Sequence, residues 1–235
     1  AQYYKPADLT TALALPELWD VGYALDSVDA LADSNAEQAL DFLGSLSRKY
    51  GCWFTSGSVM AEIGGLYYNR ALVVNPRGEL VAHYDKVHLV PFITVEDGVF
   101  EMGSEPCIYD LNGITAGNVI CYDIMFPEWV RIYALRGVEI LFVCSQWTRG
   151  RMELCEPRLL AHSCGNRLYT GAVHNCGLSG ELDFGGGSLI SDPSGVLAVK
   201  GSGEADGRLS ELDLGEGAAN RQYLKVIEKR RPDLY

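Results

Sequence analysis

Basic residues are scarce in this chain of 235 residues, which carries 19 Lys and Arg against 31 Asp and Glu, a net charge of −12. Nucleic acids and anionic membranes attract basic surfaces, so this balance argues against both as partners. No apolar run approaches the roughly 20 residues that a membrane helix needs. The N-terminus also lacks a signal-peptide pattern. We therefore expect a cytoplasmic protein that contacts neither nucleic acid nor membrane.

The sequence also lacks the patterns of a metal site or a disulfide framework. It contains no Cys-x-x-Cys pair, and its four histidines stand apart without ligand spacing. The seven cysteines are odd in number and scattered, which favours reduced thiols over disulfides. They are Cys52, Cys107, Cys121, Cys144, Cys155, Cys164 and Cys176.

No low-complexity linker, internal repeat or abrupt change of composition divides the chain, so we expect one domain over residues 1–235. Apolar periodicity predicts strands that alternate with helices early and form hairpins in between, which indicates an α/β protein with mixed sheets. The expected strands cover residues 11–15, 53–58, 70–74, 80–83, 114–120, 138–143, 168–174, 188–190, 196–199 and 208–214. The expected helices cover residues 34–50, 127–135 and 156–166.

The predicted helix over residues 34–50 has recognisable signals at both ends. Ser34 and Glu37 have the spacing of a capping box, in which each side chain accepts a hydrogen bond from the backbone N–H of the other residue. Gly51 follows the last apolar position and is typical of a helix C-terminal cap.

Cys121 stands at the end of an apolar run, and the helix start Pro127-Glu128 follows shortly after it. That order predicts a thiol on a sharp turn between a strand and a helix. A nucleophile needs this geometry, because its side chain and nearby backbone N–H groups then face the same space. The alternative interpretation is a small buried core residue, which is the usual role of a free cysteine.

Glu17 and Lys86 also stand just beyond predicted strands. A cysteine with a pKa of about 8.5 is mostly a thiol at neutral pH and needs both a base and a stabiliser of negative charge. No histidine follows a strand end in a way that suggests a Cys-His pair, whereas a glutamate and a lysine do. Taken singly, each of the two charged residues could equally be a solvated surface charge.

Five segments along the chain carry a family resemblance. They are Pro16-Glu17-Leu18-Trp19, Asp85-Lys86-Val87-His88-Leu89, Cys121-Tyr122-Asp123 with Phe126-Pro127-Glu128, Gly186-Gly187-Ser188 with Asp192-Pro193, and Arg230-Arg231-Pro232-Asp233-Leu234-Tyr235. In this order they resemble the signature segments of the nitrilase-like carbon–nitrogen hydrolases, and the resemblance covers nearly the whole chain.

The resemblance implies a fold and a set of catalytic residues. The family fold is a four-layer αββα sandwich of two mixed sheets flanked by helices. Its Glu-Lys-Cys triad matches Glu17, Lys86 and Cys121, and a second family glutamate is best matched by Glu96. The family uses no metal and no organic cofactor.

The implied reaction is hydrolysis of an amide through a cysteine thioester. Glu17 would act as the base for Cys121, while Lys86 and the backbone N–H of Tyr122 would stabilise the oxyanion. Glu96 would orient Lys86 or the substrate. The substrates would be an amide and water, and the products a carboxylic acid and ammonia or an amine.

Residues after the cysteine favour the amidase branches. Family members that hydrolyse nitriles tend to carry Trp-Glu there, whereas Tyr122-Asp123 resembles omega-amidase-like enzymes. A small linear amide is therefore the expected substrate. Trp147 and Tyr23 are candidates for the substrate pocket, although either could be a core or interface aromatic.

The sequence departs from the family pattern at two places. The family normally has a further strand and helix before its first signature segment, and we expect them to be missing here. The family also has an Arg-Ala-x-Glu-Asn type segment, where this chain carries His162-Ser163-Cys164-Gly165-Asn166, with glycine in place of glutamate. A helical glycine costs about 1 kcal/mol relative to alanine.

The helix expected after Cys121 also bears on assembly. The segment Glu128 to Leu135 places Trp129, Val130, Ile132 and Tyr133 on more than one helix face, which predicts a homodimer or larger assembly through this helix. The alternative is burial within one chain. A non-catalytic scaffold of the same fold, nitrile hydrolysis and acyl transfer to an amine are the other possible functions.

Overall fold

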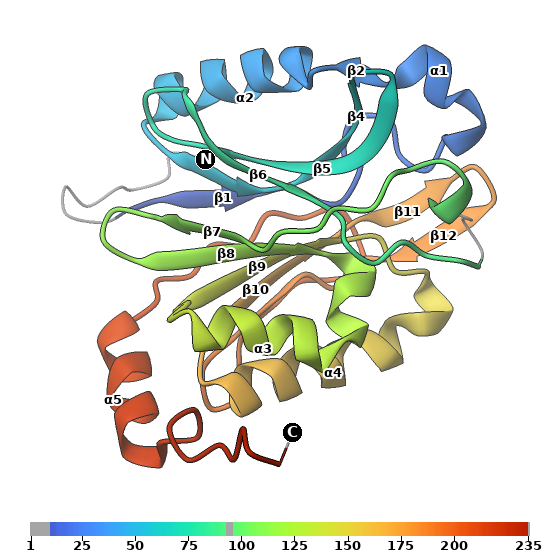
Figure 1. Ribbon diagram of the computed structural model, residues 1–235. Coiled ribbons are helices and arrows are strands. Elements are labelled where there is room, and N and C mark those ends of the chain that lie inside the picture. The colour runs from blue at the N-terminus through green and yellow to red at the C-terminus, as the bar shows by residue number, and fades with distance from the viewer. Residues whose placement is uncertain (1–9, 93–95, 235) are drawn as a thin grey trace.

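The computed structural model describes residues 10–92 and 96–234. In this part of the chain two six-stranded sheets face each other, and helices cover the outer side of each, which gives four layers (Figure 1). This arrangement is the expected αββα sandwich. No helix among the described residues is long and apolar enough to cross a membrane.

The first sheet has the strand order β1-β3-β5-β4-β2, and β6 also pairs with β5. Its strands are β1 (Ala12–Ala14), β2 (Asp33–Ser34), β3 (Trp53–Ser56), β4 (Ser58–Ile63), β5 (Leu66–Val74) and β6 (Leu80–Asp85). The pairs β1–β3 and β2–β4 are parallel and the others antiparallel. Helix α2 (Glu37–Tyr50) covers its outer face, and the short helices η1 (Leu25–Ser27) and α1 (Val28–Leu31) lie at one end (Figure 1).

The second sheet has the strand order β14-β13-β10-β9-β8-β7. Its strands are β7 (Cys107–Asp110), β8 (Thr115–Ile120), β9 (Ile140–Ser145), β10 (Tyr169–His174), β13 (Leu189–Ser191) and β14 (Leu197–Lys200). Strands β10, β9 and β8, which are neighbours in this sheet, run parallel to one another. Helices α3 (Pro127–Leu135) and α4 (Met152–Asn166) cover the outer face, and α5 (Leu214–Leu224) lies beyond the sheet (Figure 1).

Three short 3₁₀ helices and a small hairpin complete the architecture around one end of the sandwich. They are η2 (Glu96–Gly98), η3 (Cys121–Met125), η4 (Arg149–Arg151), and the antiparallel strands β11 (Cys176–Ser179) and β12 (Leu182–Gly185).

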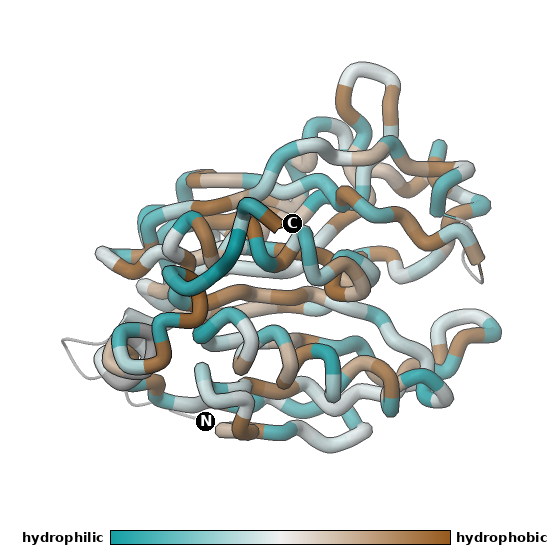
Figure 2. The backbone as a smooth tube through the Cα atoms, turned by 60° about the horizontal axis from the view of Figure 1, so that its bottom comes forward, coloured by the Kyte–Doolittle hydropathy of each residue, from teal (hydrophilic) through white to brown (hydrophobic). Residues whose placement is uncertain are grey.

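The main core lies between the two sheets and under α3 and α4. Strand β9 is buried along its whole length, as expected for a central parallel strand whose two faces are both covered. Hydrophobic positions recur along the central strands in Figure 2. A hydrogen bond from the Tyr109 hydroxyl to the carbonyl of Thr55 links the two sheets at 3.2 Å. This continuous interior fixes the strand ends that carry the site.

The predicted start of the first long helix is wrong, whereas its predicted end is confirmed. Ser34 belongs to β2, and α2 begins at Glu37. The carboxylate of Asp33 accepts hydrogen bonds from the backbone N–H groups of Gln38 and Ala39 at 3.1 and 2.8 Å. It therefore caps the helix, because these first-turn N–H groups have no partner within the helix. Gly51 ends the helix in the left-handed conformation with φ 60°.

Two other strand predictions need correction. The run expected as one strand over residues 53–58 breaks at Gly57, whose φ is +121°, and β4 continues from Ser58. A Cβ at Gly57 would lie 2.7 Å from the Cβ of Leu15, so glycine is required there. The expected strand over residues 208–214 is not a strand, and α5 begins at its last residue.

Helix α4 accommodates the glycine that departs from the family pattern. The helix continues through Gly165 to Asn166, and a Cβ at Gly165 would meet no atom within 4 Å. Packing therefore does not require glycine there. His162, one turn earlier, is buried, and its ring Nε2 lies 2.7 Å from the carbonyl oxygen of Ile124. This contact ties α4 to η3, the segment that begins with Cys121.

Candidate active site

Cys121 lies where the sequence predicts it, directly after β8 and at the first position of η3. Its φ of 46° is in the left-handed region, which a non-glycine residue adopts only when its surroundings enforce it. The turn directs the chain from the second sheet into α3, which starts at Pro127. The side chain lines a pocket while the residue as a whole remains buried.

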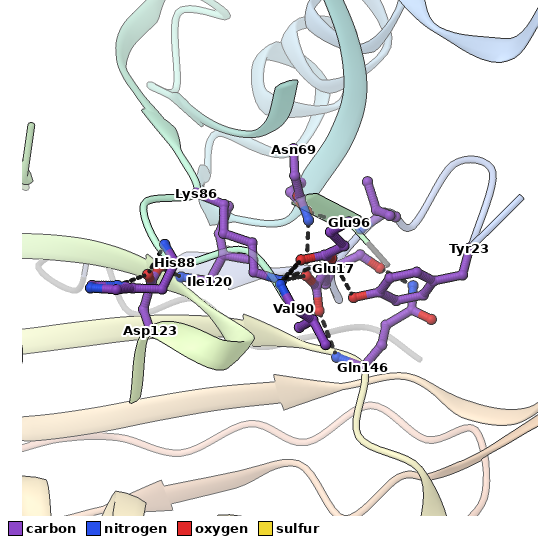
Figure 3. A network of polar contacts seen from close by, with 12 residues as sticks. Glu17, Tyr23, Asn69, Lys86, His88, Val90, Glu96, Ile120, Asp123 and Gln146 are labelled. Carbon is purple, nitrogen blue, oxygen red and sulfur yellow. Dashed lines mark hydrogen bonds and ion pairs between the residues drawn. The ribbon is translucent and has the colours of Figure 1, made fainter. Parts of the chain in front are cut away.

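Glu17, Lys86 and Glu96 form a fully buried ion-pair cluster (Figure 3). Lys86 directly follows β6, Glu17 lies three residues beyond β1, and Glu96 begins η2. The Lys86 Nζ is 2.7 Å from Glu17 Oε1 and 2.7 Å from Glu96 Oε2. The first sheet thus contributes the lysine and one glutamate, and the second sheet contributes Cys121.

Neighbouring N–H groups hold both carboxylates in place. The side-chain amide of Asn69 donates to Glu17 Oε1 at 2.9 Å, and the backbone N–H of Gln146 donates to Glu17 Oε2 at 3.0 Å. The side-chain amide of Gln146 also donates to the carbonyl oxygen of Glu17.

Glu96 receives two further hydrogen bonds besides the lysine contact. The backbone N–H of Val90 donates to Glu96 Oε2 at 2.9 Å, and the Tyr23 hydroxyl donates to Oε1 at 2.9 Å. Each carboxylate therefore has several donors in addition to Lys86, so the cluster is rigid before any substrate arrives.

Burial and charge set the protonation states of this cluster. Burial raises the pKa of the Glu17 carboxyl, although the Lys86 ammonium opposes that rise. Burial alone would lower the pKa of Lys86, but the carboxylates of Glu17 and Glu96 outweigh it and raise the pKa well above its ordinary value. Lys86 is therefore a permanent cation. A glutamate with a raised pKa is better matched to exchanging a proton near neutral pH.

The cysteine itself is a thiol at rest. Burial raises the pKa of Cys121 well above its usual value, and the Glu17 carboxylate raises it further, which outweighs Lys86. The Glu17 carboxylate lies close enough to the thiol to interact with it electrostatically. A base is thus near the proton that must leave.

Asp123 connects the Cys121 turn to the segment that carries Lys86. Its Oδ2 accepts from the backbone N–H of Ile120 at 2.9 Å and from the Tyr84 hydroxyl at 2.7 Å. Its Oδ1 accepts from the backbone N–H of His88 at 3.0 Å and lies 2.7 Å from the ring Nδ1 of the same residue (Figure 3). Since Ile120 precedes the cysteine and His88 follows Lys86 by two residues, this carboxylate fixes both segments relative to each other.

The pocket next to Cys121 is lined by the three aromatic residues that the sequence predicts for it, Tyr23, Tyr122 and Trp147. Glu17, Lys86 and Glu96 do not line it. They are fully buried, and the Tyr23 hydroxyl, which donates to Glu96, connects this cluster to the pocket lining. Among the described residues, no group of three His, Cys, Asp or Glu side chains is placed to hold a metal ion.

Sequence reasoning missed several members of the site. Gln146 follows the apolar strand β9 directly after Ser145, the same signal that pointed to Lys86 after β6. Asn69 lies inside β5 and is fully buried, so in the sequence it reads only as a polar interruption of an apolar run. Asp123 was noted only as part of the segment after the cysteine, and its contacts depend on tertiary structure.

Comparisons with known proteins identify a family that this chain resembles over most of its length. A family model described as carbon-nitrogen hydrolase matches residues 2–221. The 2-oxoglutaramate amidase of Bacillus subtilis (strain 168) is 33% identical over 231 residues, which are 98% of this chain and 88% of that protein. The chloroplastic omega-amidase of Arabidopsis thaliana is 30% identical over 238 residues, covering 94% of this chain and 63% of that protein.

A solved structure shares the fold. The crystal structure of a carbon-nitrogen hydrolase from Helicobacter pylori G27 superposes with a TM-score of 0.88 at 23% identity, and the match covers 96% of this chain and 85% of that one.

Proposed function

This chain belongs to the carbon–nitrogen hydrolase family, and we propose that it hydrolyses a small linear amide to a carboxylic acid, with Cys121 as the nucleophile. The observation that carries the proposal is the buried pair of Glu17 and Lys86 at 2.7 Å, with the Cys121 thiol near enough for both charges to act on its pKa. Relatives named as amidases support the choice of an amide.

The first half of the reaction forms a thioester. Glu17 removes the proton from the Cys121 sulfur as that sulfur attacks the amide carbon. The Lys86 ammonium and the backbone N–H of Tyr122 donate to the oxyanion that forms. An ammonium has three N–H donors, and its two carboxylate partners need only two of them, so one remains for the oxyanion. Glu17 then protonates the departing ammonia or amine as the C–N bond breaks.

The second half of the reaction releases the acid. Glu17 removes a proton from water, the resulting hydroxide attacks the thioester carbon, and the oxyanion forms at the same position. Collapse of this intermediate breaks the C–S bond, and the Cys121 sulfur recovers its proton from Glu17. Glu96 keeps the Lys86 ammonium in place, since its own orientation is fixed by Tyr23 and by the backbone of Val90.

A substrate panel tests the proposed function. Purified protein is incubated with short-chain amides, N-carbamoyl amines and nitriles, and ammonia and acid are measured. We expect short-chain amides to release ammonia and acid in equal amounts, and added hydroxylamine to divert part of the product to hydroxamate because a thioester is trapped. Release of ammonia from nitriles alone would contradict amide hydrolysis. No product from any class with folded protein would favour a non-catalytic scaffold.

We also propose that the enzyme assembles as a homodimer or larger through α3. Val130 and Tyr133 of this helix are buried in the core, whereas Trp129 and Ile132 are only partly buried and Leu135 is 44% exposed. Apolar side chains thus remain on a second face of the helix, which supports burial against another copy.

All seven cysteines are free thiols, which supports the expected cytoplasmic location of this single enzyme domain.

Light scattering of the native protein is expected to give a particle at least twice the 25.7 kDa of one chain. Leu135→Asp should shift the population towards monomer, because it places a charge in the proposed contact. Leu66→Asp is the matched control, since Leu66 is similarly exposed at 47% but lies on the first sheet. A native monomer at micromolar concentration, or equal effects of the two variants, would contradict the proposed interface.

A further inference from the structure

The hydrogen bonds to Glu17 indicate which of its oxygens exchanges protons. Oε1 accepts from Lys86 Nζ at 2.7 Å and from the side-chain amide of Asn69 at 2.9 Å. Oε2 accepts from the backbone N–H of Gln146 at 3.0 Å. A carboxylate offers about four lone pairs, so these bonds from described residues leave the remaining lone pair on Oε2. Proton exchange at Glu17 therefore takes place beside Gln146.

Gln146 is fixed against Glu17 by both of its donors. Its backbone N–H reaches Oε2, and its side-chain amide donates to the carbonyl oxygen of Glu17. A carbonyl oxygen can only accept, so the side-chain nitrogen of Gln146 must be the atom that faces it. The side-chain oxygen Oε1 is thereby directed away from that carbonyl.

This side-chain oxygen of Gln146 has no hydrogen-bond partner among the described residues. The residue is only 6% exposed, and it lines the pocket beside Cys121. A buried acceptor without a partner costs free energy, and in native proteins such atoms commonly bond to a ligand or to water. The missing partner must carry a hydrogen, because a carboxamide oxygen only accepts.

We propose that Gln146 Oε1 holds the nitrogen that leaves the substrate, and afterwards the water that takes its place. The inference rests on the proposed function and adds a catalytic residue to it. In the tetrahedral intermediate one N–H donates to Oε1, which turns the nitrogen lone pair towards Glu17 Oε2. That lone pair takes the proton from Glu17, the electron pair of the C–N bond passes to nitrogen, and neutral ammonia leaves.

The water of the second half-reaction needs the same two acceptors. One of its hydrogens is donated to Glu17 Oε2 and the other to Gln146 Oε1, so that an oxygen lone pair faces the thioester carbon. Glu17 takes the first proton as the new C–O bond forms. The electron pair of the C–S bond then returns to the Cys121 sulfur, which recovers the proton from Glu17.

A primary amide and the methyl ester of the same acid test this role. Propanamide and methyl propanoate form the same thioester with Cys121, so the ratio of their kcat/KM values reports only on the departure of ammonia or methanol. The ester has no hydrogen to donate to Gln146. Gln146→Met removes the acceptor at similar volume, and we expect it to lower the amide-to-ester ratio by about 30-fold, as for a lost hydrogen bond to a buried polar group.

Two further variants separate this role from support of Glu17. Asn69→Leu is the matched control, because Asn69 also donates to Glu17 but does not line the pocket. It should lower both kcat/KM values by the same factor and preserve their ratio. Gln146→Glu retains an acceptor oxygen and should keep most of the native ratio. Thermal melting checks the fold, and Gln146→Leu replaces Gln146→Met if the methionine variant does not fold.

Equal losses of amide and ester turnover in Gln146→Met would overturn the inference and leave amide hydrolysis standing. A fall of the ratio of the same size in Asn69→Leu would also overturn it. If the native enzyme hydrolyses the amide and not the ester, Gln146→Met should make ester turnover measurable, because it removes an oxygen that faces the ester oxygen; continued absence would contradict the proposal. If the native protein hydrolyses no substrate of any class, the proposed function fails first.

Discussion

Cys121→Ala is expected to abolish turnover while the protein stays folded. The variant removes the sulfur that forms the thioester, and loss of a catalytic nucleophile reduces kcat by about 10⁵-fold or more. The volume lost is small, and the turn around residue 121 is held by other groups, among them the Asp123 carboxylate bound to the backbone of Ile120. Ammonia release measures the activity, and thermal melting by circular dichroism measures the fold.

Cys144→Ala provides the control for this prediction, since Cys144 also lies in an apolar strand. It pairs in register with Ile120, but it does not line the pocket. Burial raises the pKa of Cys144 to about 12, so it stays an unreactive thiol at neutral pH. We expect this variant to keep its activity and to lose some stability. If Cys144→Ala is inactive in a folded protein and Cys121→Ala is active, the assignment of the nucleophile is wrong.

The positions of the reactive side chains were predictable because each follows an apolar run. Lys86 follows β6 and Cys121 follows β8, so their places at strand ends could be read from local pattern alone. The sequence pattern could not predict that these two strand ends lie close together, because β6 and β8 belong to different sheets. Only the resemblance to a family supplied the packing of one sheet on the other.

Errors in the fold prediction have local causes. Residues 208–214 place three leucines among polar residues, which resembles a strand, but a strand also needs a partner for its backbone hydrogen bonds. In the described structure these residues pair with no strand, and Leu209 is 60% exposed. The predicted start of α2 at Ser34 was wrong because Asp33, the residue before it, accepts the first-turn hydrogen bonds from its place in β2.

Buried polar positions were the hardest to predict. Asn69 donates to Glu17 from the middle of β5, and nothing in its sequence neighbours indicates this. The role of Asn69 as a hydrogen-bond donor depends on Glu17, which lies 52 positions away in the sequence. Local patterns report which residues are apolar or charged, whereas a satisfied buried network depends on which chain segments meet.

Lys86→Met is expected to reduce kcat far more than it raises KM. The ammonium interacts most strongly with the oxyanion, which exists only near the transition state, so its loss affects chemistry more than binding. Removing one such donor typically costs about 3–4 kcal/mol, or roughly 10²- to 10³-fold in rate. Lys200→Met is the matched control, because Lys200 forms a partly exposed surface pair with Glu156 and should matter little to either parameter.

The same variant should also change the dependence on pH. Burial already raises the pKa of Glu17 and Lys86 opposes the rise, so losing Lys86 raises that pKa further. The acid limb of the rate profile should therefore move to higher pH, since Glu17 must be ionised to act as the base. A carboxyl whose pKa is higher when folded binds more protons in the native state, so stability should fall as pH rises through that pKa. An increase in KM with kcat and its pH profile unchanged would make Lys86 a substrate-binding residue only.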